Sequence, residues 1–268
     1  MFKILKIASG ERVFKGATIS ALALLTIFFV GIIVSLLTYT NLRTFWSALL
    51  SEEIIFAIKL SLLTATAATI VSVIIAVPAA YAISRAQFWG KDVVDSMLDL
   101  PIVISPIALG AALLVFFNTP IGVAINDHVQ FVFAVPGIIL AQITVVSALA
   151  IRLLKSTFDS IDPRYEQVGR TLGCSKLEAF FRIILPLSKD GLVASSILTW
   201  ARAVGEFGAT VTLVGATVMK TETLPIAIFL SLASADIEKA VAVIFILIII
   251  AVVALLVIRK LIGRRYTI

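Results

Sequence analysis

Two residues of opposite charge, Arg202 and Glu206, lie in the otherwise apolar stretch from Trp200 to Gly215. They stand one helical turn apart, so in a continuous helix they share a face and partly neutralise one another. A charge in the middle of a bilayer costs about 3 kcal/mol even on insertion scales, so such residues usually face a bundle interior or a wet path. Two interpretations follow: a pathway or gate for an anion, or a structural ion pair that positions its helix.

The same stretch has small residues at a spacing that favours close helix packing. Ala201, Gly205 and Ala209 follow one another at small-x-x-x-small spacing, which allows another helix to approach closely. We expect the pathway or gate to combine the charged pair with small and polar positions beside it. These candidate residues are Arg202, Gly205, Glu206, Gly208 and Thr210.

A polar, basic and glycine-containing stretch, from Tyr165 to Leu187, stands between strongly hydrophobic segments. Its glycine at position 173 predicts the end of a short helix over residues 167–172, because glycine favours the position after a helix. Pro186 suits a first helical turn and fits the start of the next membrane helix. An exposed element of this kind can transmit motion from a partner protein, and the alternative is an ordinary loop between helices. Tyr165 is available to anchor the helix, and the groups available to meet a partner are Arg164, Arg170 and Arg182.

Residues for catalysis, metal binding or nucleotide binding do not occur in recognisable sets. The sequence has no Gly-x-x-x-x-Gly-Lys-Ser/Thr phosphate-binding loop and no His-Glu-x-x-His zinc pattern. Cys174 is the single cysteine and His128 the single histidine, so neither predicts a disulfide or a metal site. We therefore expect no catalytic residue, metal or cofactor in this chain, and a separate chain must supply any ATPase activity.

Composition assigns the chain to the membrane. Of its 268 residues, 60% are hydrophobic and 14% charged, whereas soluble domains are about 45–50% apolar. We expect an all-α membrane protein that forms a single domain over residues 1–268. Since a span needs about 20 apolar residues, the sequence has room for about six transmembrane helices. The first apolar run exceeds the core of a signal peptide, so we expect it to remain as the first helix. The candidate spans are residues 16–40, 60–84, 101–126, 128–151, a fifth from near Gly191 and 240–258.

The basic residues predict the orientation. Most of the 22 Lys and Arg residues fall before the first span, between the second and third, after the fourth and after the sixth. Short basic loops stay on the cytoplasmic side, so both termini and the loop at 165–187 are expected in the cytoplasm. The net charge of +6 is therefore a topology signal and not a sign of nucleic-acid binding, which needs one basic surface. Residues 91–100 suit a short interfacial helix, with a second partner-contact surface as the alternative.

The basic stretch resembles the cytoplasmic EAA loop of permease subunits of ATP-binding cassette (ABC) importers. In that loop a glycine is followed by an Ile-x-Leu-Pro ending, matched here by Gly173 and the segment from Ile183 to Pro186. The opening differs, because Gln167 and its two following residues replace Glu-Ala-Ala and Glu166 comes one position early. The residues assigned to an ATPase-coupling loop at about 156–190 are Tyr165, Glu166, Gln167, Val168, Gly169, Arg170, Gly173, Ile183, Leu185 and Pro186.

A second resemblance narrows the branch to permeases for tetrahedral oxyanions. The segments that carry it are Ala201–Ala209, Leu100–Gly110, Thr119–Gly122 and Lys220–Ala227, within a likeness over about residues 58–258. The Gly-Ala-Thr after Phe207 favours molybdate and tungstate over sulfate.

The resemblance implies a type I ABC importer permease-like bundle in the cell membrane. It implies a homodimer, two ATPase subunits that bind ATP and magnesium, and an extracellular oxyanion-binding protein, working by alternating access. The function we expect is import of molybdate or tungstate. A sulfate, thiosulfate or phosphate permease and a passive anion channel are the alternatives.

Overall fold

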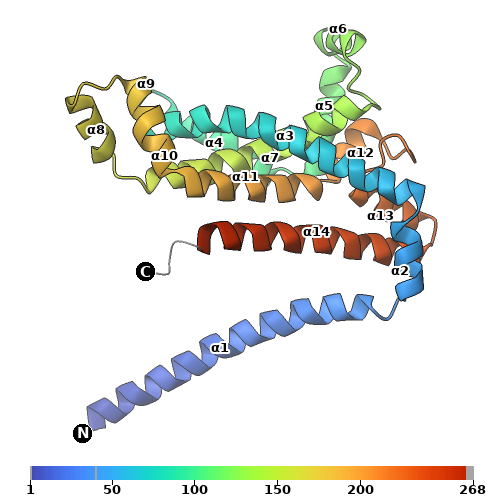
Figure 1. Cartoon of the computed structure of the whole chain (residues 1–268), viewed down its shortest axis with the longest axis horizontal. Helices are drawn as coiled ribbons and strands as arrows, with labels where there is room; N and C mark the ends of the chain where they lie inside the picture. Colours follow the sequence, from blue (N-terminus) through green and yellow to red (C-terminus); the bar gives the residue numbers. More distant parts are fainter. Residues whose placement is uncertain (1, 40, 264–268) are drawn as a thin grey trace.

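The computed structural model describes the backbone of residues 2–39 and 41–263, and the side chains of residues 14–39, 41 and 43–260. The described residues form helices and no strand. Long helices run along the longest axis, and short helices gather at its two ends (Figure 1). The expected all-α membrane class is confirmed. Arg264 and Arg265, which contribute to the predicted orientation, lie outside the described residues.

Four helices among the described residues are long and apolar enough to cross a membrane, and a bent pair raises the number to five. The four are α1 (Phe2–Leu36), α3 (Glu52–Arg85), α7 (Val135–Asp159) and α14 (Ile237–Gly263). The bent pair is α4 (Lys91–Val103) and α5 (Pro106–Phe117). The predicted fifth span corresponds to α11 (Lys189–Val204), which has only 16 residues. The shorter elements are α2 (Leu42–Leu49), α6 (Pro120–His128), α8 (Arg164–Thr171), α9 (Lys176–Ala179), the π-helix η1 (Phe180–Ile184), α10 (Leu185–Leu187), α12 (Gly208–Val214) and α13 (Leu224–Ala233).

The predicted span over residues 101–126 is not one continuous helix. The chain bends by 108° between α4 and α5, and it breaks again before α6. Both breaks precede a proline, which disfavours helical geometry in the residue before it. Ser105 and Thr119 are accordingly extended, with ψ of 141° and 158°, and each side chain caps the helix that follows.

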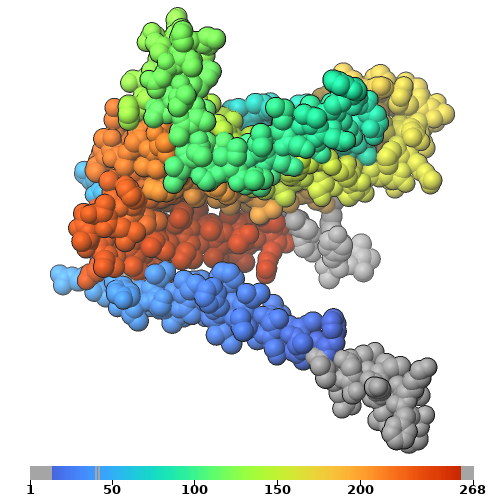
Figure 2. Space-filling model, turned by 180° about the vertical axis from the view of Figure 1, so that it is seen from behind, coloured from blue at the N-terminus to red at the C-terminus, as the bar shows by residue number. Residues whose placement is uncertain are grey.

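The centre of the bundle is built by α3, α7 and α11, which pack against one another. One buried cluster, which includes Leu60, Ile138 and Leu213, lies where α5 and α12 join α3 and α7. A second cluster, around Leu154 and Phe158, lies towards the end of α3 at which α8 is attached. These two clusters position the two candidate sites. The first predicted span is present as α1, whose apolar side chains are exposed from Phe14 to Val34 and which diverges from the main body (Figure 2).

Candidate functional site

The predicted short helix of the basic loop is present as α8, at the end of the bundle shown on the left of Figure 1. It ends before Gly173, which has a φ of 94°, a left-handed conformation that glycine adopts without a steric penalty. Ser175 and Glu178 then form a capping box that begins α9. The hydrogen bonds from Ser175, together with Arg182, hold the pKa of Glu178 below its usual value. Local turn chemistry therefore explains the shape of this loop.

The inner side of α8 is attached to the bundle by Glu166. Its Oε1 accepts a 2.9 Å hydrogen bond from the Tyr81 hydroxyl of α3. Its Oε2 lies 4.0 Å from the Nε of Arg85, and that guanidinium also donates to the carbonyl oxygens of Phe158 and Ile161. Glu166 thus joins α8 to the ends of α3 and α7.

Close packing provides a second attachment. Gly169 is buried, and a Cβ at this position would lie 2.2 Å from Cδ1 of Ile183, so α8 rests directly on η1. The Phe180 ring of η1 packs on Tyr81, with ring centroids 4.7 Å apart. The side chain of Tyr165 is 57% exposed, and its role as an anchor of the helix stays a prediction.

The outer side of α8 is apolar and open. Tyr165, Val168 and Leu172 are all exposed and line a surface hollow of about 570 Å³ together with Ile183. The remaining predicted residues of the loop lie elsewhere, with Gln167 and Arg170 on the inner side of α8. Gln167 and Arg170 are exposed, Leu185 is partly buried, and Pro186 is exposed in α10 rather than at the start of α11.

Arg202 and Glu206 do form an ion pair, but not on one continuous helix. The helix α11 ends at Val204, and Glu206 lies in the break before α12. Its Oε2 accepts a 2.8 Å hydrogen bond from Nη1 of Arg202, and its Oε1 accepts one of 3.0 Å from the backbone amide of Ala209. The Glu206 side chain is 1% exposed and that of Arg202 is 40% exposed. The carboxylate is therefore fully engaged, and the guanidinium is partly free.

A polar side chain that the sequence analysis missed supports this break. Gln142 of α7 is buried, and its Nε2 donates a 3.0 Å hydrogen bond to the carbonyl oxygen of Ala203 near the end of α11. The same carbonyl accepts a 3.1 Å hydrogen bond from the backbone amide of Glu206, so the Gln142 amide adds a second donor where the regular helix ends. A single amide side chain in an apolar span is the signal from which this role could have been predicted.

The predicted close approach through Gly205 is also wrong. Gly205 is exposed, and the nearest atoms to a Cβ there would be 3.9 Å away, within its own helix. The close contact instead joins α5 to α12, where a Cβ on Gly110 would lie 2.7 Å from the Ala209 carbonyl oxygen. Gly208 likewise lies against Pro106 and Ile107. Of the five predicted pathway residues, Arg202 and Gly205 are exposed, whereas Glu206, Gly208 and Thr210 are buried.

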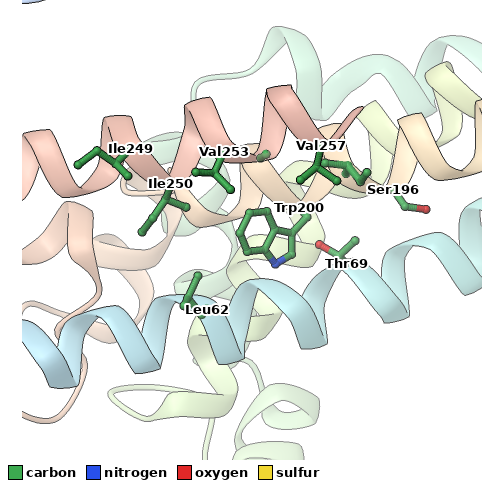
Figure 3. Close-up of a pocket in the computed structure, with 10 residues that line it drawn as sticks. Leu62, Thr69, Ser196, Trp200, Ile249, Ile250, Val253 and Val257 are labelled. Carbon is green, nitrogen blue, oxygen red and sulfur yellow. The ribbon is translucent and has the colours of Figure 1, made fainter. Parts of the chain in front are cut away.

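Another side of α11 faces an apolar groove of about 540 Å³ between α3 and α14. Figure 3 shows the Trp200 indole between Leu62 of α3 and Ile250 and Val253 of α14. The indole Nε1 donates to Thr66 Oγ1 at 3.0 Å. A groove lined in this way matches hydrocarbon and not a charged solute.

Buried acidic chemistry also occurs at the opposite end of the bundle from α8. Glu53 of α3 and Lys239 of α14 form a 2.7 Å ion pair. Next to Glu53, Glu222 is fully buried before α13, and its Oε2 accepts a hydrogen bond from the Met219 amide. Burial raises the pKa of Glu222 to about 7. No sequence pattern predicted this group.

Comparison with known proteins agrees with the geometry. Residues 69–267 match the family described as binding-protein-dependent transport system inner membrane component. The chain belongs to this family. It is thus a multi-pass membrane permease, and the expected kinship with ABC importer permeases is confirmed.

Several relatives have names that specify a transported element. A probable molybdenum ABC transporter permease protein of Haloferax volcanii is 36% identical over 79% of this chain and 77% of its own length. The molybdenum transport system permease protein ModB of Haemophilus influenzae is 36% identical over 65% of this chain and 78% of its own. A molybdate/tungstate transport system permease protein, WtpB of Pyrococcus abyssi, is 39% identical over 58% of this chain and 59% of its own.

The fold has a counterpart in a solved structure. A bacterial ABC transporter involved in the import of the acidic polysaccharide alginate contains a chain that superposes with a TM-score of 0.75. The match covers 99% of this chain and 100% of that chain at 18% identity. At this identity the likeness concerns the fold alone.

Proposed function

We propose that this chain is the membrane-spanning permease subunit of an ATP-driven importer of molybdate or tungstate. The observation that carries the proposal is the 36% identity, over 79% of this chain, to a probable molybdenum permease. The segments that favoured this branch in the sequence flank the break between α11 and α12: Arg202 lies in the last turn of α11, and Gly208-Ala209-Thr210 begin α12.

The proposed assembly contains two copies of this chain, two ATPase subunits and an extracellular binding protein. ATP and magnesium belong to the ATPase subunits. The apolar outer side of α8, with Tyr165, Val168 and Leu172 exposed, supplies a surface on which an ATPase subunit can dock. Its inner side supplies rigid attachments to α3 and η1, so movement of α8 reaches the bundle. Alternating access then follows as a shift between two states that ATP biases.

The proposed orientation places α8 in the cytoplasm. The basic residues of the loop favour that side, and α1 begins and α14 ends towards the end of the bundle that carries α8 (Figure 1). The end that carries α6 and α13 would then face outward and meet the binding protein.

For the charged pair, the structure favours a mainly positioning role for Glu206. Both of its oxygens accept hydrogen bonds, so it holds Arg202 and the first turn of α12 in place. The partly exposed guanidinium of Arg202 is the group that remains to meet a passing anion.

ATP hydrolysis by the reconstituted complex tests the proposal. The full chain is placed in liposomes with its ATPase subunits, and binding protein loaded with molybdate, tungstate or sulfate is added outside. We expect stimulation by molybdate or tungstate. Stimulation by sulfate alone would support the importer function but show that molybdate and tungstate are not the cargo. Anion flux that continues without ATP would favour the passive channel.

A further inference from the structure

A polar cavity of about 360 Å³ lies between the end of α3 and the inner side of α8. It is distinct from the apolar hollow on the outer side of the same helix, because the residues that line the two come from opposite faces of α8. Its charged lining comprises Arg85, Arg170, Lys176 and a single carboxylate, Glu166.

The charges in this cavity do not balance. Glu166 is already engaged with the Tyr81 hydroxyl and faces Arg85. Among the described residues, no ion pair is found for Arg170 or Lys176, and both side chains are exposed. The lining therefore carries an excess of positive charge at the mouth of the cavity.

One of the cations that line the cavity also has a buried hydrogen-bond donor without a partner among the described residues. The Nε of Arg85 is buried and has no hydrogen-bond partner in the described part of the chain. A buried donor without a partner is costly, and the guanidinium already uses its Nη2 for two backbone carbonyls. A ligand with several acceptor oxygens would satisfy both this donor and the exposed cations.

We propose that this cavity binds a phosphate-type tetrahedral oxyanion group, held by Arg85, Arg170 and Lys176. Arginine matches the oxygens of such a group in two-point contacts, and lysine adds a compact charge. Two sources share this chemistry: a free oxyanion in the cytoplasm and the headgroup of an anionic lipid, which basic pockets near the cytoplasmic surface attract. Since Glu166 both lines the cavity and joins α8 to α3, a bound anion stiffens that joint. This consequence for coupling rests on the proposed function, whereas the binding itself does not.

Binding is measured on the full chain purified in detergent. One arm follows the thermal unfolding midpoint in inorganic phosphate against chloride at equal ionic strength. The other arm uses native mass spectrometry to count retained phosphatidylglycerol against zwitterionic phosphatidylcholine. The test variant is Arg170→Gln/Lys176→Gln, whose two exposed side chains are not needed for packing. The control is Arg164→Gln/Arg182→Gln, which removes the same charge from the same loop but outside the cavity.

We expect phosphate or phosphatidylglycerol to bind the wild-type chain and the control alike, and the test variant about tenfold more weakly, which is a modest loss for two charge-assisted contacts. A phosphate effect without lipid retention assigns the site to a free oxyanion, and the reverse assigns it to a lipid. Equal losses in both variants would show a general charge effect and overturn the site. Impaired assembly with the ATPase in the test variant, without any anion dependence, would assign these cations to the ATPase and also overturn it.

Discussion

Two glutamates, Glu166 in the α8 loop and Glu206 in the α11–α12 break, both accept hydrogen bonds at their carboxylates. Their partners differ in how far away they lie along the sequence. Glu206 binds Arg202 and the amide of Ala209, within one turn of chain on either side. Glu166 binds Tyr81, which is 85 residues away on α3. The carboxylate of Glu206 therefore shapes its own segment, and that of Glu166 ties a peripheral helix to the bundle. A local contact fixes a turn, whereas a long-range contact can carry movement between elements.

The largest effect is expected where the α11–α12 region meets α5. Gly110→Leu should prevent folding or lower the free energy of unfolding by about 3 kcal/mol, because overpacking against backbone atoms allows little relaxation. Yield and the unfolding midpoint in detergent measure the effect. Gly205→Ala is the matched control, because a methyl group there meets no other helix. Equal damage from both substitutions would contradict the assignment of the close contact to Gly110.

The two carboxylates can be compared directly by truncation. Glu206→Ala should lower the free energy of unfolding by about 2 kcal/mol, because it leaves a buried amide and a guanidinium without their acceptor. Glu166→Ala should cost about 1 kcal/mol, because its surroundings are wetter, but should weaken stimulation of the ATPase more. Unfolding midpoints and ATPase rates for the two variants separate these effects. A reversed order in both measurements would remove the distinction between local and long-range roles.

The sequence predicted what short-range chemistry determines. The α8 helix, its end before Gly173 and the pairing of Arg202 with Glu206 all depend on residues a few positions apart. The contacts that attach these segments to the bundle depend on residues far away in the sequence. These are Tyr81 for Glu166, Gln142 for the end of α11, and Gly110 for Ala209. A single sequence holds no record of such pairings, although an isolated amide in an apolar span is a usable sign.

The helix breaks were missed for a different reason. Hydropathy alone makes residues 101–126 one apolar span. Ser105 and Thr119, however, each precede a proline and begin a new helix. This signal was present in the sequence and should outweigh hydropathy. The α11–α12 break has no proline, and its Gly205 is only a weak indication.

A smaller structural effect is expected at Gly173, with a large functional one. Gly173→Val should cost about 1–2 kcal/mol, because a branched side chain is disfavoured at a φ of 94°. The space around it is open, so the strain falls on the backbone and should tilt α8. We expect membrane insertion to persist and ATPase stimulation to be lost. Gly173→Asn is the control, because asparagine tolerates this conformation. Full transport by the valine variant would contradict the coupling role of the loop.

The smallest expected effect concerns Glu222, the buried acid at the end of the bundle opposite α8. Unlike Glu206, it has one oxygen without a partner among the described residues, and it faces Glu53 while Lys239 already pairs with that carboxylate. Burial raises its pKa from 4.5 to about 7 in the folded chain. The protonated form therefore fits the fold, and the stability that it contributes is complete below pH 4.5 and is lost as the pH rises through about 7.

The unfolding midpoint should accordingly fall by a few degrees, of the order expected for about 1 kcal/mol, between pH 5 and 8. Glu222→Gln keeps the hydrogen-bond acceptor and removes the titration, so its midpoint should vary less over that range. Glu52→Gln, at an exposed position in the first turn of α3 at the same end of the bundle, controls for loss of a negative charge. If the glutamine variant retained the full pH dependence, a group other than Glu222 would be responsible for it.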